Sequence, residues 1–92
     1  MEIRNPIQKM IYEIIVIDIL KNKRGFSSIT NREIYSKLEI NISQNSVRDH
    51  VIWLVNNGFL QRVYNYWDDN FNFFNRALYL GKKMETTTQF NL

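Results

Sequence analysis

The sequence predicts a single α+β domain in which three helices precede an antiparallel β-hairpin. Capping residues stand before three helix-forming segments, and two β-rich stretches flank a polar turn in the second half of the chain. With 92 residues and no cysteine, the chain can build one small core and cannot reinforce it with disulfides. We expect the domain to cover residues 1–80 and a polar tail to cover residues 81–92.

The first helix is predicted over residues 7–22. Pro6 suits a first helical turn, Asn5 suits the cap before it, and Gly25 is expected to end the segment. The helical period places Ile7, Ile11, Ile14 and Asp18 on one face, and further apolar residues widen that surface on both sides. A helix that covers only one side of a core does not need this much apolar surface.

The second and third helices are predicted over residues 31–38 and 44–57. Thr30 and Glu33 form a capping box before the second helix. Ser43 caps the third, Val47 and Val51 begin its core stripe, and Gly58 stops it. A turn of about four residues separates the two helices, which is typical of a helix-turn-helix.

A β-hairpin is predicted over residues 59–80. Residues 59–66 and 71–80 are rich in β-forming side chains, and residues 67–70 supply a turn. The hairpin directly follows the third helix, in the position that a wing takes.

These segments resemble bacterial and archaeal winged-helix repressors. The matching positions in the third helix are Ser43, Ser46, Val47, Arg48 with Asp49, Val51 with Leu54, and Gly58 followed by Phe59 and Leu60. Residues 29–38 resemble the second helix of the same family, and the likeness covers roughly residues 26–80. The resemblance implies a winged helix-turn-helix fold. The high content of Ile and Asn is similar to that of small proteins from archaeal viruses and plasmids.

The third helix carries the expected DNA-reading surface. With its core stripe turned inward, the residues left near its exposed N-terminal end are Gln44, Asn45, Ser46, Arg48 and Asp49. Asn and Gln can pair with adenine and Arg with guanine in the major groove. The alternative for each residue is an ordinary solvated face.

Basic residues outside this helix are expected to contact phosphates. Arg32 and Lys37 lie on the second helix, and Arg62 and Arg76 lie on the two hairpin strands. The predicted hairpin tip carries Asp68 and Asp69, which phosphate repels, so we do not expect the tip to enter the minor groove deeply.

The surplus apolar surface of the first helix predicts a homodimer. Two-fold dimers are the commonest oligomers, and they place two reading helices on half-sites about one turn, roughly 34 Å, apart. The alternative is a helix buried entirely within the monomer. The residues expected at the dimer interface are Ile7, Met10, Ile11, Ile14 and Ile17.

Composition excludes several other classes of function. A net charge of +3 and a pI of about 9.3 are compatible with nucleic acid. His50 is the only histidine, and no nucleophile set or phosphate loop stands out, so we expect no enzyme, metal, cofactor or small-molecule ligand. We see neither a membrane span nor a signal peptide, and expect a cytoplasmic protein, in the host cell if its origin is viral.

The predicted function is therefore sequence-specific binding of double-stranded DNA by a homodimeric transcription regulator. Two alternatives stay open at this point. One is a winged-helix module that docks proteins and not DNA, because its hairpin is acidic and aromatic. The other is a nonspecific architectural DNA binder, which the modest charge disfavours.

Overall fold

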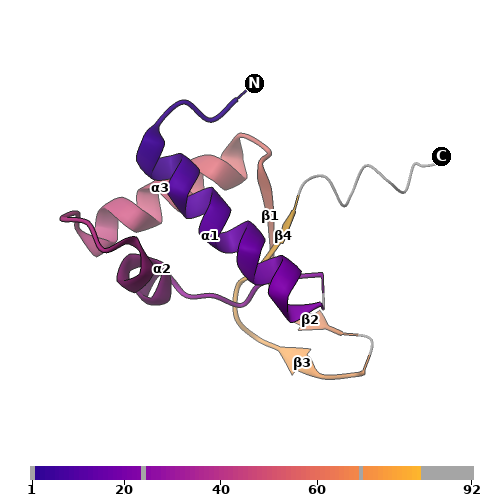
Figure 1. Ribbon diagram of the computed structural model, residues 1–92. Helices are drawn as coiled ribbons and strands as arrows, with labels where there is room; N and C mark the ends of the chain where they lie inside the picture. The colour runs from indigo at the N-terminus through magenta and orange to yellow at the C-terminus, as the bar shows by residue number, and fades with distance from the viewer. Residues whose placement is uncertain (1, 24, 69, 82–92) are drawn as a thin grey trace.

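The computed structural model of the chain describes residues 2–23, 25–68 and 70–81, and it has three helices followed by short antiparallel strands (Figure 1). These elements confirm the predicted α+β class. No helix within the described residues has the length and hydropathy needed to cross a bilayer. The elements are α1 (Pro6–Asn22), α2 (Asn31–Leu38), α3 (Gln44–Asn56), β1 (Leu60–Val63), β2 (Tyr66–Trp67), β3 (Phe73–Phe74) and β4 (Leu78–Gly81).

Side-chain caps determine where each helix begins. The Asn5 Oδ1 accepts hydrogen bonds from the backbone N–H groups of Ile7 and Gln8, at 2.9 and 3.1 Å. Thr30 and Glu33 form the complete capping box of α2. At α3, the Ser43 Oγ accepts from the Ser46 N–H at 3.1 Å. These bonds satisfy N–H groups that the first turn of a helix leaves without partners.

The ends of α1 and α2 differ from a simple glycine stop. Lys23 follows α1 with φ 57° and Glu39 follows α2 with φ 54°, so both residues adopt the left-handed conformation themselves. Gly25, the expected stop of α1, has φ 83° and lies beyond the cap. The chain therefore leaves α1 at Lys23, before Gly25, the residue that was predicted to end the helix.

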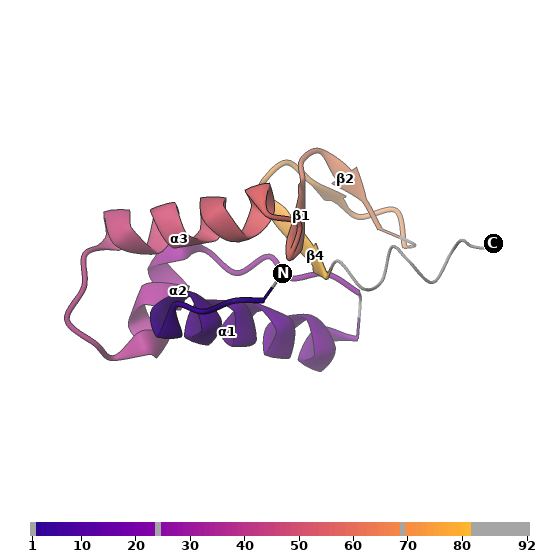
Figure 2. The ribbon, with the colours of Figure 1, turned by 90° about the horizontal axis from the view of Figure 1, so that it is seen from above.

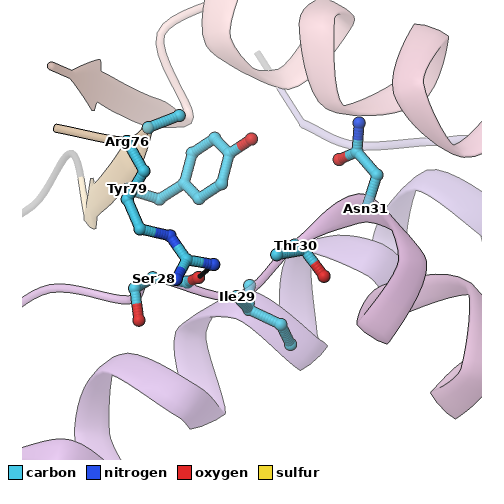
Figure 3. Close-up of a pocket in the computed structure, with 7 residues that line it drawn as sticks. Ser28, Ile29, Thr30, Asn31, Arg76 and Tyr79 are labelled. Carbon is cyan, nitrogen blue, oxygen red and sulfur yellow. Dashed lines mark hydrogen bonds between the residues drawn. The ribbon is translucent and has the colours of Figure 1, made fainter.

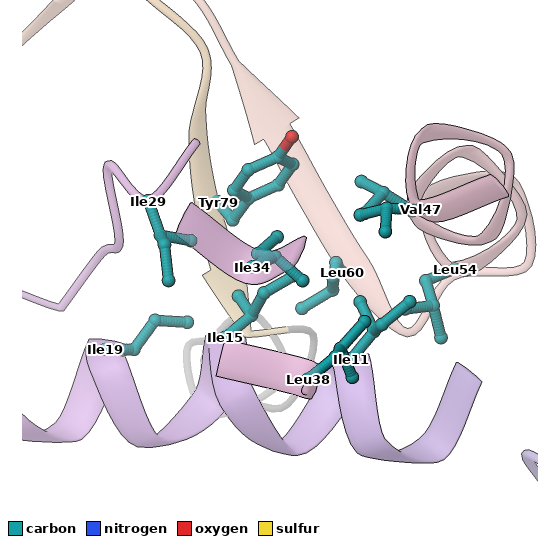
Figure 4. Packing of buried hydrophobic residues seen from close by; sticks show 11 residues of the cluster. Ile11, Ile15, Ile19, Ile29, Ile34, Leu38, Val47, Leu54, Leu60 and Tyr79 are labelled. Atoms are coloured by element: carbon teal, nitrogen blue, oxygen red, sulfur yellow. The ribbon is translucent and has the colours of Figure 1, made fainter. Parts of the chain in front are cut away.

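The core lies between α1 on one side and α3 with the sheet on the other (Figure 4). Ile11, Ile15 and Ile19 point from α1 into this cluster, and each is at most 5% exposed. The face predicted from Ile7, Ile11, Ile14 and Asp18 is therefore rotated from the true one. Ile7 and Ile14 are half-buried at its edge. The sequence could not determine the rotation because isoleucine and valine surround this helix on nearly every side.

The sheet joins the hairpin to the segment before α2. β1 pairs antiparallel with β4, with Arg62 opposite Tyr79. On the other edge of β4, Ser27 and Tyr79 exchange backbone hydrogen bonds of 2.9 and 2.8 Å. The Ser27 hydroxyl is fully buried and donates to the Asp18 Oδ2 at 2.6 Å. Asp18, which interrupts the apolar run of α1, thus fastens that helix to the sheet.

The hairpin consists of two short ladders and not one continuous pair of strands. Beyond β1 and β4, Asn65 has φ 53°, and β2 then pairs with β3 through Tyr66 and Phe74. At the tip, the Asp68 carboxylate accepts hydrogen bonds from Asn70 and Asn72. Asp69, the second acid of the predicted tip, and residues 82–92 of the predicted tail lie outside the described residues.

Candidate nucleic-acid interface

The solvent side of α3 forms a polar surface near the start of the helix. Val47, Val51 and Leu54 are fully buried on its inner side. The exposed residues nearest the start of the helix, which we call the outer face of α3, are Gln44, Asn45, Arg48, Asp49 and Ile52. Four of the five residues predicted to read DNA belong to this face.

Two local contacts affect how these side chains are presented. The Arg48 Nε lies 3.8 Å from the Asp49 Oδ1, and both side chains are more than half exposed. An exposed ion pair of this kind is weak, so Arg48 can leave Asp49 at little cost. Ser46 is half-buried, and its hydroxyl accepts a hydrogen bond from the Ser43 hydroxyl at 3.1 Å. Ser46 therefore stabilises the helix start and is poorly placed to read a base.

The two basic residues of α2 lie on different sides of that helix. Arg32 is exposed near its N-terminus, the positive end of the helix dipole. Lys37 lines a hollow together with Ile14, Ile17, Asp18 and Lys21 of α1. Lys37 thus borders α1 and lies away from the outer face of α3. We therefore no longer expect Lys37 to contact a phosphate beside that face.

Arg62 is held within the sheet. Its guanidinium carbon lies 5.5 Å from the centre of the Tyr79 ring, on the neighbouring strand β4. The Arg62 Nε is buried and has no hydrogen-bond partner among the described residues. Burial raises the pKa of the Tyr79 hydroxyl, and the charge of Arg62 acts in the opposite direction. Arg62 therefore serves the packing of the sheet, in contrast to the exposed role predicted for it.

Arg76 closes one side of a pocket at the N-terminus of α2 (Figure 3). Its Nη2 donates to the backbone carbonyl of Ser28 at 3.1 Å. The pocket has a volume of about 190 Å³, and the Asn31 side chain on its other side points toward the α3 ribbon. The Asn31 Oδ1 is buried without a hydrogen-bond partner in the described part of the chain. This orphaned acceptor could not be predicted from the sequence, where Asn31 is only the first residue of a helix.

The Glu33 carboxylate lies at the same end of α2, and its pKa is lowered there. Hydrogen bonds from the Thr30 backbone N–H and hydroxyl to the Glu33 carboxylate lower the pKa of Glu33, and the nearby charge of Arg76 acts in the same direction. Glu33 therefore keeps its negative charge beside the N-terminus of α2. A phosphate at this end would have to approach from the side of Arg32 and avoid Glu33.

The hairpin carries exposed aromatic side chains. Trp67 and Phe73 face each other across β2 and β3 with ring centres 4.8 Å apart, and both are about half exposed. Phe71 at the tip is 83% exposed. Tyr66 differs from them, because its ring packs edge-on against the buried Phe26. The distal hairpin thus presents rings and few charges, so its contribution to an electrostatic interface is small.

The residues predicted for a dimer interface fall into three groups. Ile11 is fully buried in the core, so its prediction as an interface residue is wrong. Ile7 and Ile14 are half-buried, whereas Met10 and Ile17 are 38% and 55% exposed. Leu20, which the prediction omitted, is 70% exposed. We call Met10, Glu13, Ile17, Leu20 and Lys21, all of them exposed, the outer face of α1.

No group of three or more His, Cys, Asp or Glu side chains in the described residues is arranged to hold a metal ion. Comparison with known proteins identifies no relative: no protein-family model, no curated protein and no solved structure matches the chain. The features of the described residues that bear on function are the two outer faces and the hairpin.

Proposed function

We propose that this protein is a winged helix-turn-helix regulator that binds double-stranded DNA in a sequence-specific manner. The outer face of α3 supports this function above all, because Gln44, Asn45 and Arg48 are exposed beside the start of the helix. The distal hairpin lies on the same side of the molecule as α3, away from α1 (Figure 2). This is the relation that a reading helix and its wing require.

The proposed chemistry is direct readout in the major groove. An α-helix fits that groove, and side chains near its N-terminus reach the edges of the bases. The amides of Gln44 and Asn45 can each pair bidentately with adenine, and the Arg48 guanidinium with guanine. Arg32, at the N-terminus of α2, is the proposed phosphate contact that sets the register. The proposed activity is binding alone, without catalysis.

The direct test is binding of a fluorescent duplex pool across a salt series. We expect affinity to fall steeply as salt rises, because cations bound to phosphates are released when the protein binds. Selection of bound sequences from the random pool then separates a specific regulator, which enriches one motif, from an architectural binder, which enriches none. Absence of binding at low salt would contradict the proposal.

The exposed aromatic residues of the hairpin support a second candidate, a module that docks another protein. Trp67, Phe71 and Phe73 are exposed aromatic side chains of the distal hairpin, and the rings of Trp67 and Phe73 lie 4.8 Å apart. Aromatic side chains are enriched at protein interfaces. The salt series separates the two candidates, because a docking module without DNA binding leaves the duplex free at every salt concentration.

The proposed regulator is a homodimer that pairs through the outer face of α1. Met10, Ile17 and Leu20 are apolar side chains in contact with water, and a second copy of the same surface can cover them. Sedimentation at micromolar concentrations tests this part separately from DNA binding. A monomer at every concentration would remove the dimer and leave the binding surface of α3 unaffected.

A further inference from the structure

The outer faces of α1 and α3 lie on opposite sides of the molecule. In Figure 1 α1 lies in front of the core and α3 behind it, and in Figure 2 α1 lies below and α3 above. The inner sides of both helices meet in one core, because Ile11 and Ile15 of α1 and Val47 and Leu54 of α3 belong to the same buried cluster. The outer faces therefore point in opposite directions.

The outer face of α1, together with the half-buried Ile14 at its edge, has a symmetric pattern centred on Ile17. Glu13 precedes Ile17 by four residues and Lys21 follows it by four. Ile14 precedes Ile17 by three residues and Leu20 follows it by three. Residues three and four apart lie next to one another on a helix surface, so all four side chains surround Ile17.

This pattern matches a second copy of the same helix in antiparallel orientation. A two-fold axis through Ile17 places Glu13 of each copy beside Lys21 of the other, so opposite charges meet on both sides. It also places Leu20 of one copy against Ile14 of the other. A parallel pair would instead bring Glu13 against Glu13 and Lys21 against Lys21, which disfavours that orientation.

A hollow on the surface beside α1 offers space for Leu20 of the second copy. It has a volume of about 310 Å³ and is lined by Ile14, Ile17, Asp18, Lys21 and Lys37. Leu20 is the most exposed apolar residue of α1 and lies three residues beyond the axis. The antiparallel arrangement directs Leu20 of each copy toward Ile14 in the hollow of the other. The surface therefore has both the projecting side chain and the space that receives it.

We propose that α1 pairs with α1 of a second copy about Ile17, and that the resulting dimer holds two separate DNA duplexes together. A two-fold axis perpendicular to α1 reverses the direction from α1 to α3, so the two outer faces of α3 point away from each other. The dimer then does not place both copies of α3 on half-sites of one straight duplex, as the expected spacing of about 34 Å requires. This inference rests on the proposed binding of DNA by α3.

A bridging assay tests the consequence. A duplex of about 30 base pairs, roughly three helical turns, is fixed to beads, and capture of a second, fluorescent duplex is measured at about 50 mM salt. Wild-type protein is expected to capture the second duplex. Ile17→Glu adds one negative charge per copy beside Glu13, so that four negative charges lie at the centre of the pair. We expect this variant to reduce capture at least tenfold, while its affinity for one duplex changes less than about twofold.

The outcomes separate the inference from the proposed function. Undiminished capture by Ile17→Glu would overturn pairing through α1. Wild-type protein that binds one duplex and captures no second would overturn bridging and leave the proposed DNA binding intact. Failure to bind any duplex would overturn both. Because Ile17 is exposed, Ile17→Glu should keep the wild-type circular dichroism spectrum, which confirms that the variant is folded.

Cross-linking tests the position of the axis without DNA. The chain has no cysteine, so Ile17→Cys introduces the only thiol. A residue on the axis meets its own copy, and we expect a disulfide-linked dimer under mild oxidation. Asn56→Cys, an exposed position on α3, is the matched control and should form no disulfide-linked dimer. Equal cross-linking of the two variants would overturn the position of the axis.

Charge exchange tests the orientation. Glu13→Lys and Lys21→Glu each place like charges together in the antiparallel pair, so each should weaken the dimer several-fold in sedimentation. The double variant restores opposite charges and should recover the wild-type dissociation constant. In a parallel pair the single variants would leave the number of like-charge contacts unchanged. Single variants that dimerise as wild type would therefore overturn the antiparallel arrangement.

Discussion

α1 and α3 are both packed against the same core, but they differ in what they present to their surroundings. α3 buries Val47 and Val51 and exposes amides and charges. α1 buries Ile11 and Ile15 and exposes Ile17 and Leu20. A polar outer face is stable in water and can exchange that water for nucleic acid, whereas an apolar outer face is stabilised by contact with another apolar surface. The difference assigns the two helices to different partners.

The largest expected effect separates the inner and outer sides of α1. Ile15 is fully buried, so Ile15→Ala should lower the free energy of unfolding by about 2–5 kcal/mol through lost burial and a residual cavity. Ile17→Ala, on the outer side of the same helix, should cost less than about 0.5 kcal/mol at concentrations where the protein is monomeric. Urea titration measures both values.

Both substitutions replace isoleucine with alanine, so each variant is a control for the other. Similar losses of stability would mean that the outer face of α1 is covered in the monomer. The contrast between α1 and α3 would then disappear, because the outer face of α1 would not be free for a partner.

A second prediction concerns the partly buried hydrogen bonds that Asp18 of α1 accepts. Asp18 accepts hydrogen bonds from the Ser27 hydroxyl at 2.6 Å and from the Asn22 amide at 3.0 Å. Asp18→Ala leaves the buried Ser27 hydroxyl without this acceptor and should cost about 1–3 kcal/mol in the free energy of unfolding. Adding Ser27→Ala to this variant should cost less than Ser27→Ala does alone. Strictly additive losses in thermal unfolding would contradict a direct interaction.

A third prediction sharpens the role assigned to α3. If Arg48 reads a base, Arg48→Ala should weaken binding to the selected site by about 1–3 kcal/mol and relax preference at one base pair. Lys37→Ala removes the same charge from the side of the molecule next to α1, and it should leave the base preference unchanged. Competition binding with single-base variants of the site checks both. Unaltered preference in Arg48→Ala would remove Arg48 from the readout.

The smallest expected effect concerns α2, which lies between the other two helices in the chain. Thr30→Ala removes the cap and should cost about 1 kcal/mol in the free energy of unfolding at neutral pH. The folded state lowers the pKa of Glu33 from its ordinary value of 4.5. Its contribution to stability is therefore complete above that value and is lost as the pH falls through the lowered pKa.

Glu33→Gln isolates the acid dependence of this cap. The stability of the variant should change less than that of wild type as the pH falls below about 4.5, the ordinary pKa of the residue. Thermal unfolding across the acid range measures the difference. Identical pH profiles for the two proteins would show that the charge of Glu33 contributes nothing to the cap.

The local features of the fold could be predicted from the sequence, because they depend on neighbouring residues. Asn5, Thr30 and Ser43 cap helices wherever they precede a helix-forming segment. The buried side of α1 could not be predicted, since Ile14, Ile15 and their neighbours are equally apolar and only the position of the other elements selects among them. A periodic pattern is informative only where polar residues interrupt it.

For the candidate site, too, only some features could be predicted from the sequence. The exposed position of Gln44 and Asn45 follows from the core stripe of α3, which the sequence contains. The half-buried position of Arg62 follows from its place opposite Tyr79, and that register depends on where the hairpin is interrupted at Asn65. The orphaned Oδ1 of Asn31 depends on contacts among α2, the sheet and α3, so no local signal could have revealed it.

The pairing of Ser27 with Tyr79 has a consequence for synthesis of the protein on the ribosome. The two residues are separated by more than half of the chain, and both are buried. Until Tyr79 has been added and has left the exit tunnel, Ser27 has no strand beside it and the isoleucines of α1 lack one wall of their core. The domain therefore completes its fold only after β4 has emerged, and until then α1 exposes apolar side chains that a chaperone can bind.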